Sequence, residues 1–214
     1  MQFCLNYSSG KDSMLALDTL VNEGHQPVCL ITSVNDEIDR SWFHGVPLNV
    51  LQAAADCLNL PLLTVPTNAT TYEDAMVAAL KRSQDYGATV AAFGDIDIEQ
   101  NGDWDKQIAQ RAGLTPVLPL WQQGRVSLVH RFLDRGYTAM IKTVSKASGI
   151  PDDFLGQPLN QTFLDYLAAH DLDLCGENGE YHTLVVDGPL FDHPLTYKTA
   201  GIFDSPHARS LIIN

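Results

Sequence analysis

A polar stretch at residues 8–13 (S-S-G-K-D-S) constrains the fold of this chain more than any other part of the sequence. It follows the apolar residues 3–5 and precedes an amphipathic pattern that begins at Met14. This order predicts a strand, a tight turn and a helix. Because a helix N-terminus carries unpaired N–H groups and the positive end of the helix dipole, the turn is suited to binding an anion.

The side chains of this stretch suit a nucleotide phosphate, and the candidate ligands are Ser8, Ser9, Gly10, Lys11, Asp12 and Ser13. Gly10 allows a close approach of the backbone, and Lys11 adds a mobile positive charge. Asp12 would repel a phosphate unless a divalent cation lay between them, so we predict that Asp12 is a Mg²⁺ ligand. The stretch differs from a Walker P-loop, which has Ser or Thr directly after the lysine. The simpler alternative is an ordinary polar helix N-terminus with a capping side chain.

Composition and charge limit which binding partners and which cellular location the sequence suggests. The chain has 214 residues and a formal net charge of −13, which argues against a broad nucleic-acid surface. It lacks the basic and then apolar pattern of a secretory signal, and it lacks the run of ~18 apolar residues that spans a membrane. The four cysteines are far apart and form no C-x-x-C pair, which favours buried free thiols over disulfides or a metal site. We therefore expect a cytoplasmic protein without membrane or nucleic-acid partners.

Strand and helix patterns alternate through the first part of the chain. Residues 27–33, 60–65 and 89–93 are short apolar runs typical of buried strands, and residues 47–58 and 71–85 have helical periodicity. Such alternation predicts an α/β fold, with a doubly wound parallel sheet whose crossovers are right-handed. Ligands bind such sheets at the carboxyl ends of the strands, which is where the polar stretch lies.

The second part of the chain changes character. We expect helices at residues 101–112, 125–135, 152–155 and 160–170, and strands at residues 137–144, 184–186, 195–203 and 208–213. Residues 116–121 (P-V-L-P-L-W) are expected to form a rigid connection. We place a domain boundary near residue 120. This gives a nucleotide-binding domain at residues 1–120 and a smaller α+β, substrate-side domain at residues 121–214.

A glycine-rich segment at residues 176–183 (G-E-N-G-E-Y-H-T) is the second candidate for chemistry. Glu177, Glu180 and His182 lie within six residues of one another beside Tyr181, just before an apolar strand pattern. Carboxylates and an imidazole at this density are typical of acid–base or ligand sites. The alternative is a glycine-rich hairpin with solvated charges, and spacing alone does not separate the two.

Two further positions lie near the ends of predicted strands. His44 is part of an aromatic segment (W-F-H-G) and is either a substrate contact or a packed histidine. Gly94, which precedes Asp95, ends a predicted strand and either approaches the nucleotide or forms a turn.

The order of these motifs resembles the diphthine–ammonia ligase family of ATP pyrophosphatases, whose phosphate loop has the pattern S-G-G-K-D-S. Ser9 is the one departure in this loop, since glycine is usual at that position, and we expect the small serine to be tolerated. The resemblance also covers residues 43–47 (F-H-G-V-P), 94–96 (G-D-I), 119–121 (P-L-W), 154–156 (F-L-G), 175–183 (C-G-E-N-G-E-Y-H-T) and 187–191 (D-G-P-L-F). The segment at residues 175–183 is the most specific, because the phosphate loop is shared with many other enzymes. The residues of this segment look more like those of the bacterial branch of the family.

The resemblance implies a HUP-type nucleotide-binding domain, of the PP-loop ATPase kind, with a family-specific C-terminal domain. It also implies a reaction in which ATP adenylates an acyl oxygen, ammonia displaces AMP and pyrophosphate leaves, with Mg²⁺ sharing the charge. The catalytic candidates are then Lys11, Asp12, Glu177 and Glu180. Gly94 joins residues 8–13 in binding ATP, and the candidate acceptor contacts are His44, Glu177, Glu180 and Tyr181. The acceptor is a protein side chain or a small carboxylic acid, and a homodimer is left open.

Two alternatives remain open from the sequence. A non-catalytic sensor would bind ATP at the same loop without forming AMP. A transferase with the same loop would act on another acceptor, either transfer RNA or a corrinoid-linked substrate. The acidic charge and the missing C-x-x-C pair count against transfer RNA.

Overall fold

A computed structural model describes residues 1–42, 44–68 and 70–214 of the chain. Its first sheet contains β1 (Gln2–Asn6), β2 (Gln26–Asn35), β3 (Arg40–Ser41), β4 (Leu62–Thr67), β5 (Val90–Ala92) and β6 (Thr115–Val117). Five of these strands are parallel and run in the order β4-β2-β1-β5-β6, while β3 pairs antiparallel with the end of β2. The prediction of an α/β fold with a parallel-sheet core is therefore confirmed.

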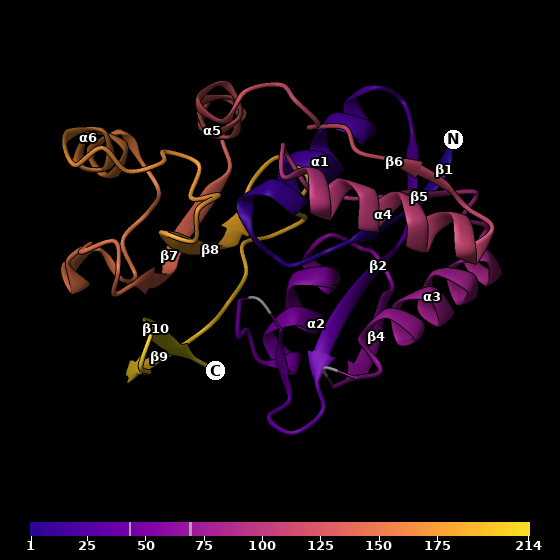
Figure 1. Ribbon diagram of the computed structural model, residues 1–214, viewed down its shortest axis with the longest axis horizontal. Helices are drawn as coiled ribbons and strands as arrows, with labels where there is room; N and C mark the ends of the chain where they lie inside the picture. Colours follow the sequence, from indigo (N-terminus) through magenta and orange to yellow (C-terminus); the bar gives the residue numbers. More distant parts are fainter. Residues whose placement is uncertain (43, 69) are drawn as a thin grey trace.

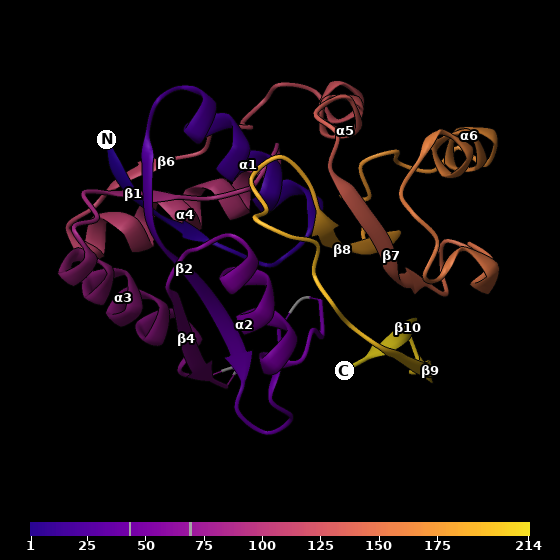
Figure 2. The ribbon, with the colours of Figure 1, turned by 180° about the vertical axis from the view of Figure 1, so that it is seen from behind.

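Helices cover both faces of this sheet, as Figures 1 and 2 show from opposite sides. They are α1 (Lys11–Asn22) and α2 (Leu48–Cys57) on one face and α3 (Tyr72–Ser83) and α4 (Glu99–Ala112) on the other. The alternation of side chains along β1 explains the two layers. Phe3 and Leu5 pack into the core that contains α1, whereas Cys4 packs into the core that contains α3 and α4.

The second sheet is antiparallel and has the order β8-β7-β10-β9. Its strands are β7 (Thr138–Ser145), β8 (Tyr181–Asp187), β9 (Thr199–Asp204) and β10 (Ala208–Ile213), and the helices of this part are α5 (Arg125–Asp134) and α6 (Gln161–Ala169). Short 3₁₀ turns lie at Gln84–Tyr86 and Asp152–Phe154. In Figure 1 these orange and yellow elements lie beside the first sheet, with α6 at the far end.

The apolar core runs without interruption from the first sheet into the second. One cluster joins Leu17 of α1 to Phe132 of α5, Ile141 of β7 and Phe163 of α6. A partly buried ion pair adds to it, because the Asp18 carboxylate accepts hydrogen bonds from the Arg135 guanidinium (2.7 and 2.9 Å) and from the Tyr137 hydroxyl (2.9 Å). A break near residue 120 stays a prediction, since the two sheets share this core.

Three expectations about local structure were wrong. Residues 116–121 do not all form a connection, because residues 115–117 pair with β5 as the edge strand β6, where Pro116 is tolerated. Residues 34 and 35 extend β2 and pair with β3. The last strand pair begins at Thr199, because the apolar Leu195 packs against α2 instead of entering a strand.

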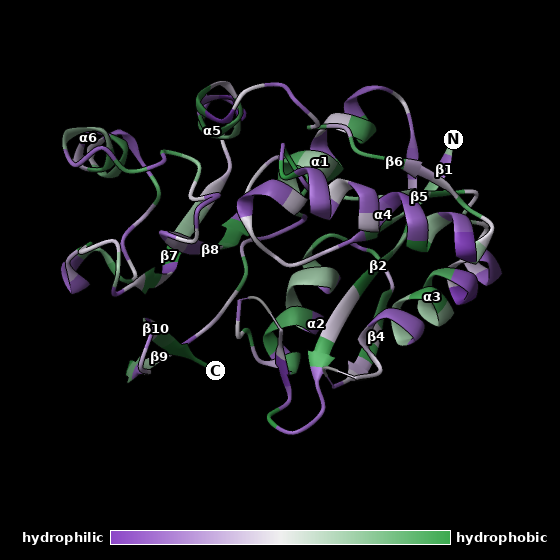
Figure 3. Cartoon of the chain, in the orientation of Figure 1, coloured by the Kyte–Doolittle hydropathy of each residue, from purple (hydrophilic) through white to green (hydrophobic). Residues whose placement is uncertain are grey.

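Side-chain polarity follows this arrangement. In Figure 3 the outer turns of α4 are largely hydrophilic, while β10 and the end of β2 are apolar. All four cysteines are buried free thiols, as the sequence led us to expect. Among the described residues, no helix is both long and apolar enough to cross a lipid bilayer.

The strand order fixes where a ligand can bind. The chain moves from β1 to β2 and β4 on one side, then crosses to β5 and β6 on the other side. The loops after β1 and β5 therefore diverge at the carboxyl ends of two neighbouring strands, which is the usual binding crevice of such sheets.

Candidate functional site

A cavity of about 650 Å³ lies at this crevice. Its walls come from four parts of the chain: the end of β1 with the phosphate loop at residues 8–13, the segment at His44, the β5–α4 connection with the first turns of α3 and α4, and residues 176–183. The two stretches singled out from the sequence thus share one cavity, although about 170 residues separate them.

The phosphate loop turns sharply at Ser9, whose φ of 64° lies in the left-handed region. For a residue with a Cβ atom this conformation costs about 1–2 kcal/mol, which accounts for the glycine usual in related loops. Two hydrogen bonds hold the turn. The Ser9 hydroxyl donates to the carbonyl of Ser8 (2.5 Å), and the Ser9 carbonyl accepts from the N–H of Val185 (2.8 Å).

Two glycines permit close packing around this loop. A Cβ atom on Gly10 would lie 2.4 Å from Cε1 of His44, so only glycine allows this imidazole to cover the loop. A Cβ atom on Gly94 would lie 3.0 Å from the main-chain nitrogen of Ser13. Gly94 therefore brings the end of β5 directly against the first turn of α1, and it also lines the cavity.

Lys11 and Asp12 form an ion pair at the start of α1. The Lys11 ammonium lies 2.7 and 2.9 Å from the two carboxylate oxygens of Asp12, and both residues line the cavity. Burial, the largest single influence, lowers the pKa of Lys11, but the Asp12 carboxylate together with smaller effects of neighbouring groups holds that pKa well above its usual value. Lys11 is therefore a permanent positive charge at the loop.

The hydroxyl groups of the loop are already ordered. Ser8 and Ser13 line the cavity with their Oγ atoms 3.2 Å apart, and the Ser13 hydroxyl also lies 3.0 Å from the carbonyl of Gly10. The N–H of Lys11 donates to Oγ1 of Thr183 (3.0 Å). One orphan donor of α1 is thus satisfied by β8.

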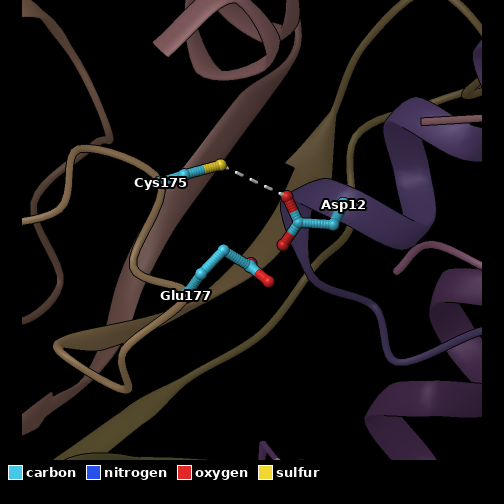
Figure 4. Close-up of side chains that lie close together, drawn as sticks. All are labelled: Asp12, Cys175 and Glu177. Atoms are coloured by element: carbon cyan, nitrogen blue, oxygen red, sulfur yellow. Dashed lines mark hydrogen bonds between the residues drawn. The ribbon is translucent and has the colours of Figure 1, made fainter. Parts of the chain in front are cut away.

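Asp12, Cys175 and Glu177 converge from two ends of the chain (Figure 4). Each of the three can offer one ligand atom, and these atoms all lie within 4.8 Å of one another. The Cys175 sulfur is 3.9 Å from a carboxylate oxygen of Asp12. Burial and the neighbouring Asp12 raise the pKa of Glu177 to about 7, which suits a group that exchanges protons near neutral pH.

Glu180 has a different environment from Glu177. Its carboxylate accepts hydrogen bonds from the N–H groups of Asp173 (3.2 Å) and Asn178 (3.0 Å) and from the side-chain amide of Asn178 (3.1 Å). Glu180 is buried and is absent from the cavity wall in the part of the chain that the structure describes. Its contacts fold the glycine-rich segment, while its predicted role in catalysis stays untested.

Tyr181 lies beneath the phosphate loop. The Lys11 ammonium is 5.6 Å from the centre of its ring, a favourable cation–π distance. Its hydroxyl donates to the carbonyl of Leu174 (2.7 Å), and burial raises its pKa, so the phenol stays neutral. Tyr181 supports Lys11 and lines the cavity; its predicted contact with the acceptor stays a prediction.

Two histidines form the wall above the loop. The rings of His44 and His182 are 4.8 Å apart, and Nδ1 of His44 is 3.0 Å from the carbonyl of Thr183. Burial lowers the pKa of His44 to about 3 and that of His182 to about 4, helped by each one's basic neighbours. Both imidazoles are therefore neutral at physiological pH and offer hydrogen bonds without charge.

Sequence reasoning missed the arginine that holds the glycine-rich segment. Arg125 donates to both carboxylate oxygens of Asp97 (2.7 and 2.8 Å), to Asp173 (2.5 Å) and to the side-chain oxygen of Asn178 (3.1 Å). Asp173 in turn accepts from the N–H of Glu177 (3.1 Å). No sequence signal connects these residues, since 28 and 48 positions separate Arg125 from its two carboxylates.

A further part of the cavity wall was also missed, apart from Asp95. It consists of Tyr72, Asp95, Asn101, Trp104 and Asp105, which we call the acid–aromatic lobe. The one signal in the sequence is Trp104, a large aromatic residue in an otherwise polar helical segment at residues 99–107. An aromatic side chain in such a place is typical of a binding surface.

Comparisons with known proteins identify the family of this chain. Residues 1–116 match the family model of the diphthamide synthase N-terminal domain, and residues 125–204 match that of the diphthamide synthase C-terminal domain. The chain is 26% identical over 215 residues to the diphthine–ammonia ligase of Bos taurus, with 86% of this chain and 78% of the relative covered. The relative from Schizosaccharomyces pombe, also named diphthine–ammonia ligase, is 28% identical over 214 residues, but the match covers 34% of that longer protein.

A solved structure supports the fold. The predicted subunit of a tRNA methyltransferase from Methanocaldococcus jannaschii superposes with a TM-score of 0.50 over 88% of this chain and 98% of that one. Its sequence identity is 15%, so the likeness concerns the fold alone. The family matches, in contrast, cover most of the chain and confirm the family predicted from its motifs. This chain belongs to the diphthamide synthase family.

Proposed function

We propose that this chain is an ATP-dependent C–N ligase that joins ammonia to a carboxyl group and releases AMP and pyrophosphate. Its family and its named relatives support this activity. The observation that carries the proposal is the convergence of Lys11, Asp12 and Glu177 in one cavity. Groups that neutralise phosphate charge and a group that exchanges protons lie together there.

The reaction needs two steps. A carboxylate oxygen of the acceptor attacks the α-phosphorus of ATP, the bond to the β-phosphate bridging oxygen breaks, and pyrophosphate leaves. Ammonia then attacks the acyl carbon of the adenylate, the bond from that carbon to the AMP oxygen breaks, and an amide, AMP and a proton result. The adenylate is required because a free carboxylate has no adequate leaving group.

The phosphate loop stabilises the charge that builds on pyrophosphate. The first N–H groups of α1 and the Lys11 ammonium provide fixed positive potential, and such preorganised groups are usually the largest catalytic contribution. The neutral His44 and His182 add hydrogen bonds without a competing charge. Together these groups favour release of pyrophosphate over release of a single phosphate.

A Mg²⁺ ion fits the donor set, and we propose that Asp12 holds it. The ion prefers carboxylate and phosphate oxygens, and Asp12 offers such an oxygen at the edge of the loop. Cys175 does not suit this ion, because thiol sulfur is a soft donor and burial raises its pKa to about 12. When bound, the ion would share the phosphate charge with Lys11.

We assign the acid–base role to Glu177 and a positioning role to Glu180. Glu177 faces Asp12 from the glycine-rich segment, whereas the Glu180 carboxylate is engaged by main-chain N–H groups. Glu177 accepts the proton that ammonium must lose before it attacks the adenylate. Glu180 keeps the segment folded so that Glu177 stays beside the loop.

The acceptor of this chain is proposed only by chemical class. It carries a carboxyl group, either on a protein side chain or on a small acid. The relatives are named for diphthine, and we carry over the reaction without the named substrate. We further propose a cytoplasmic location, since all four cysteines are free thiols.

Product analysis tests the proposal. The protein is incubated with α-labelled ATP, Mg²⁺, ammonium chloride and size-fractionated cell extract as the source of acceptor, and the nucleotides are separated by chromatography. We expect AMP and pyrophosphate with at least one fraction, and no AMP with a Lys11→Ala variant. ADP as the product would overturn the proposal. ATP that binds but stays intact with every fraction would favour a sensor, and AMP that requires the transfer-RNA fraction would favour a transferase.

A further inference from the structure

The acid–aromatic lobe offers aromatic faces and acidic side chains at one end of the cavity. The rings of Tyr72 and Trp104 lie 5.8 Å apart at an angle of 31°, and both residues line the cavity. Trp42 packs edge-on against Tyr72 at 6.1 Å and completes the aromatic cluster from behind. The faces of such rings attract cations through their quadrupoles.

Two carboxyl groups accompany these rings. The Asp95 carboxylate accepts a hydrogen bond from the side-chain amide of Asn101 (3.0 Å) and lines the cavity. Asp105 also lines the cavity but is only 2% exposed, and its Oδ2 atom receives no hydrogen bond from another donor group among the described residues. Its neighbour is the Asp95 carboxyl, with which it can share a proton. Buried polar atoms are nearly always satisfied, so two neighbouring carboxyls need a proton or another cation between them.

Charge divides the cavity into two ends. Within the described part of the chain, its one positively charged lining residue is Lys11 at the phosphate loop, where the neutral His44 and His182 also lie. The lobe contributes Asp95 and Asp105 and no basic side chain. A triphosphate is attracted to the first end and repelled from the second, which is suited to a small cation.

We propose that the acid–aromatic lobe binds the ammonium ion that the amidation consumes. The ion has four N–H donors, and the lobe offers carboxyl oxygens of Asp95 and Asp105 together with the face of Trp104. This inference rests on the proposed function, because it places the nitrogen donor of that reaction. The lobe collects the charged form, which predominates in neutral water, at the edge of the active centre.

Transfer from the lobe to the reaction follows from its neighbours. Asp95 of the lobe and Glu177 of the glycine-rich segment line the same cavity, so the ion can pass from one to the other without leaving it. The ammonium ion gives one proton to the Glu177 carboxylate, and the resulting ammonia attacks the acyl carbon of the adenylate as AMP leaves. The nitrogen then loses a second proton to water, which gives the neutral amide. Nitrogen, protons and charge balance without a further reactant.

The titration of Asp105 agrees with a bound cation. Burial, followed by the charge of Asp95, raises the pKa of Asp105 to about 9, while Lys106 on the same helix opposes the shift. On the neighbouring helix α3, burial and then the charge of Asp105 raise the pKa of Tyr72, whose hydrogen bond with Ser33 opposes the shift. An empty lobe therefore holds a proton on Asp105, and a cation that binds there replaces the proton.

Steady-state kinetics with Asp95→Asn and Asp105→Asn variants test the site. Ammonium chloride is varied at saturating ATP and acceptor, and ionic strength is held constant with sodium chloride. We expect each variant to raise the KM for ammonium by about 10- to 100-fold, the worth of one charge-assisted contact, with the KM for ATP unchanged within twofold. Asp103→Asn is the matched control, because this exposed carboxylate lies on the same helix and pairs only with Lys106 among the described residues; its kinetics should equal those of the wild type.

Three other outcomes would reject the proposal that the lobe binds ammonium. A rise in the KM for ATP with an unchanged KM for ammonium would make the lobe the adenosine subsite. Inhibition by tetramethylammonium that competes with the acceptor would make it a subsite for an organic cation of the acceptor. An unchanged KM for every substrate would leave the lobe without a role in binding.

A binding measurement separates this inference from the proposed function. The thermal midpoint of the wild type is measured in ammonium chloride and in sodium chloride, and again for Asp95→Asn. Stabilisation by ammonium that is lost in the variant supports the lobe even if no turnover is found. Equal midpoints in the two salts, with AMP formation intact, would reject the lobe and keep the ligase.

Discussion

The main-chain N–H of Lys11 donates to the side-chain hydroxyl of Thr183, which lies 172 residues later in the chain, at 3.0 Å. A second bond, from the N–H of Val185 to the carbonyl of Ser9 (2.8 Å), reinforces this junction. Strand β8 of the antiparallel sheet therefore holds the phosphate loop of the parallel sheet. The shape of the nucleotide site depends on both parts of the chain, and Thr183 is the side chain that joins them.

Replacing Thr183 by Val should loosen this junction without changing its volume. The N–H of Lys11 would be left unpaired in a buried place, which costs about 1–3 kcal/mol. We expect the free energy of unfolding to fall by that amount in urea titrations, and ATP affinity to weaken by a few fold in calorimetry. Thr199→Val, at the exposed start of β9, is the matched control. Equal stability of the two variants would mean that the bond does not hold the loop.

Replacing Lys11 by Ala should weaken ATP binding. The change removes one charge-assisted phosphate contact, worth about 1.5–3 kcal/mol, or about 10- to 150-fold in the dissociation constant. Calorimetry with ATP and Mg²⁺ measures the effect. Lys106→Ala removes a lysine from α4 that lies outside the cavity wall described here, and it should bind like the wild type. ATP affinity equal in both variants would exclude Lys11 as a phosphate ligand.

Replacing Glu177 by Gln should slow amide formation while leaving ATP binding within a few fold. A positioned base is worth about 10²–10⁴ in rate. The pKa of about 7 also sets the pH dependence, since Glu177 must be deprotonated to accept a proton. Wild-type turnover should therefore rise with pH up to about 7 and level off above it, and this limb should disappear in the variant. A limb that persists in Glu177→Gln would assign the titration to another group.

Replacing Glu180 by Gln tests whether this residue holds the glycine-rich segment in place or acts as the acid–base group. The Glu180 carboxylate accepts hydrogen bonds from the N–H groups of Asp173 and Asn178. In the variant, the amide NH₂ group would replace one of the two accepting oxygens and could not accept such a bond. We expect a lower thermal midpoint and slower turnover, with the pH limb of Glu177 retained. A normal midpoint with the pH limb abolished would return the acid–base role to Glu180.

Arg125 should act on the reaction through the glycine-rich segment. Arg125→Met removes the guanidinium that joins Asp97 to Asp173, and with it a positive charge that lowers the pKa of Glu177. We expect turnover to fall by about tenfold, the KM for ATP to stay unchanged, and the kinetic pKa to move above that of the wild type. Arg125→Lys should restore the pKa more than the turnover, because lysine keeps the charge but not the forked geometry. A kinetic pKa that does not move would reduce Arg125 to a structural role.

Local sequence was enough to predict the phosphate loop and its sheet. The loop is a contiguous strand, turn and helix, and the strands around it have continuous apolar runs, so each signal lies within one segment. Even the departure at Ser9 could be noted, although its left-handed φ became visible only in the structure. The parallel sheet then placed the loop at the binding edge.

The roles within the glycine-rich segment could not be read in the same way. Glu177 and Glu180 are three residues apart in a segment without helix or strand periodicity, so no rule decides which carboxylate faces the cavity. The choice is made by Arg125 and Asn178, through contacts between distant or irregular parts of the chain. Trp104 was missed for a related reason. Its aromatic neighbour Tyr72 belongs to α3, so the pair forms only when distant segments pack together.

Asp105 should make stability depend on pH in a direction opposite to that of most carboxylates. Its pKa is about 9 in the folded chain, raised by burial and then by Asp95, and 3.8 when unperturbed. Between these values the folded state holds a proton that the unfolded state has lost, so the free energy of unfolding falls as pH rises through this window, by at most about 1.4 kcal/mol per pH unit. The contribution is complete below pH 3.8 and is lost as pH approaches 9.

Asp105→Asn removes this titration and keeps the shape of the side chain. Because every other ionisable group is shared, the difference in free energy of unfolding between variant and wild type isolates Asp105. We expect the variant to gain on the wild type steadily from pH 5 to pH 8 in urea titrations, with a higher thermal midpoint at pH 8. The same variant should bind ammonium more weakly, because residues that serve ligand binding often lower the stability of the folded chain. A difference that does not change with pH would mean that Asp105 is ionised throughout, and that its charge is already balanced in the folded chain.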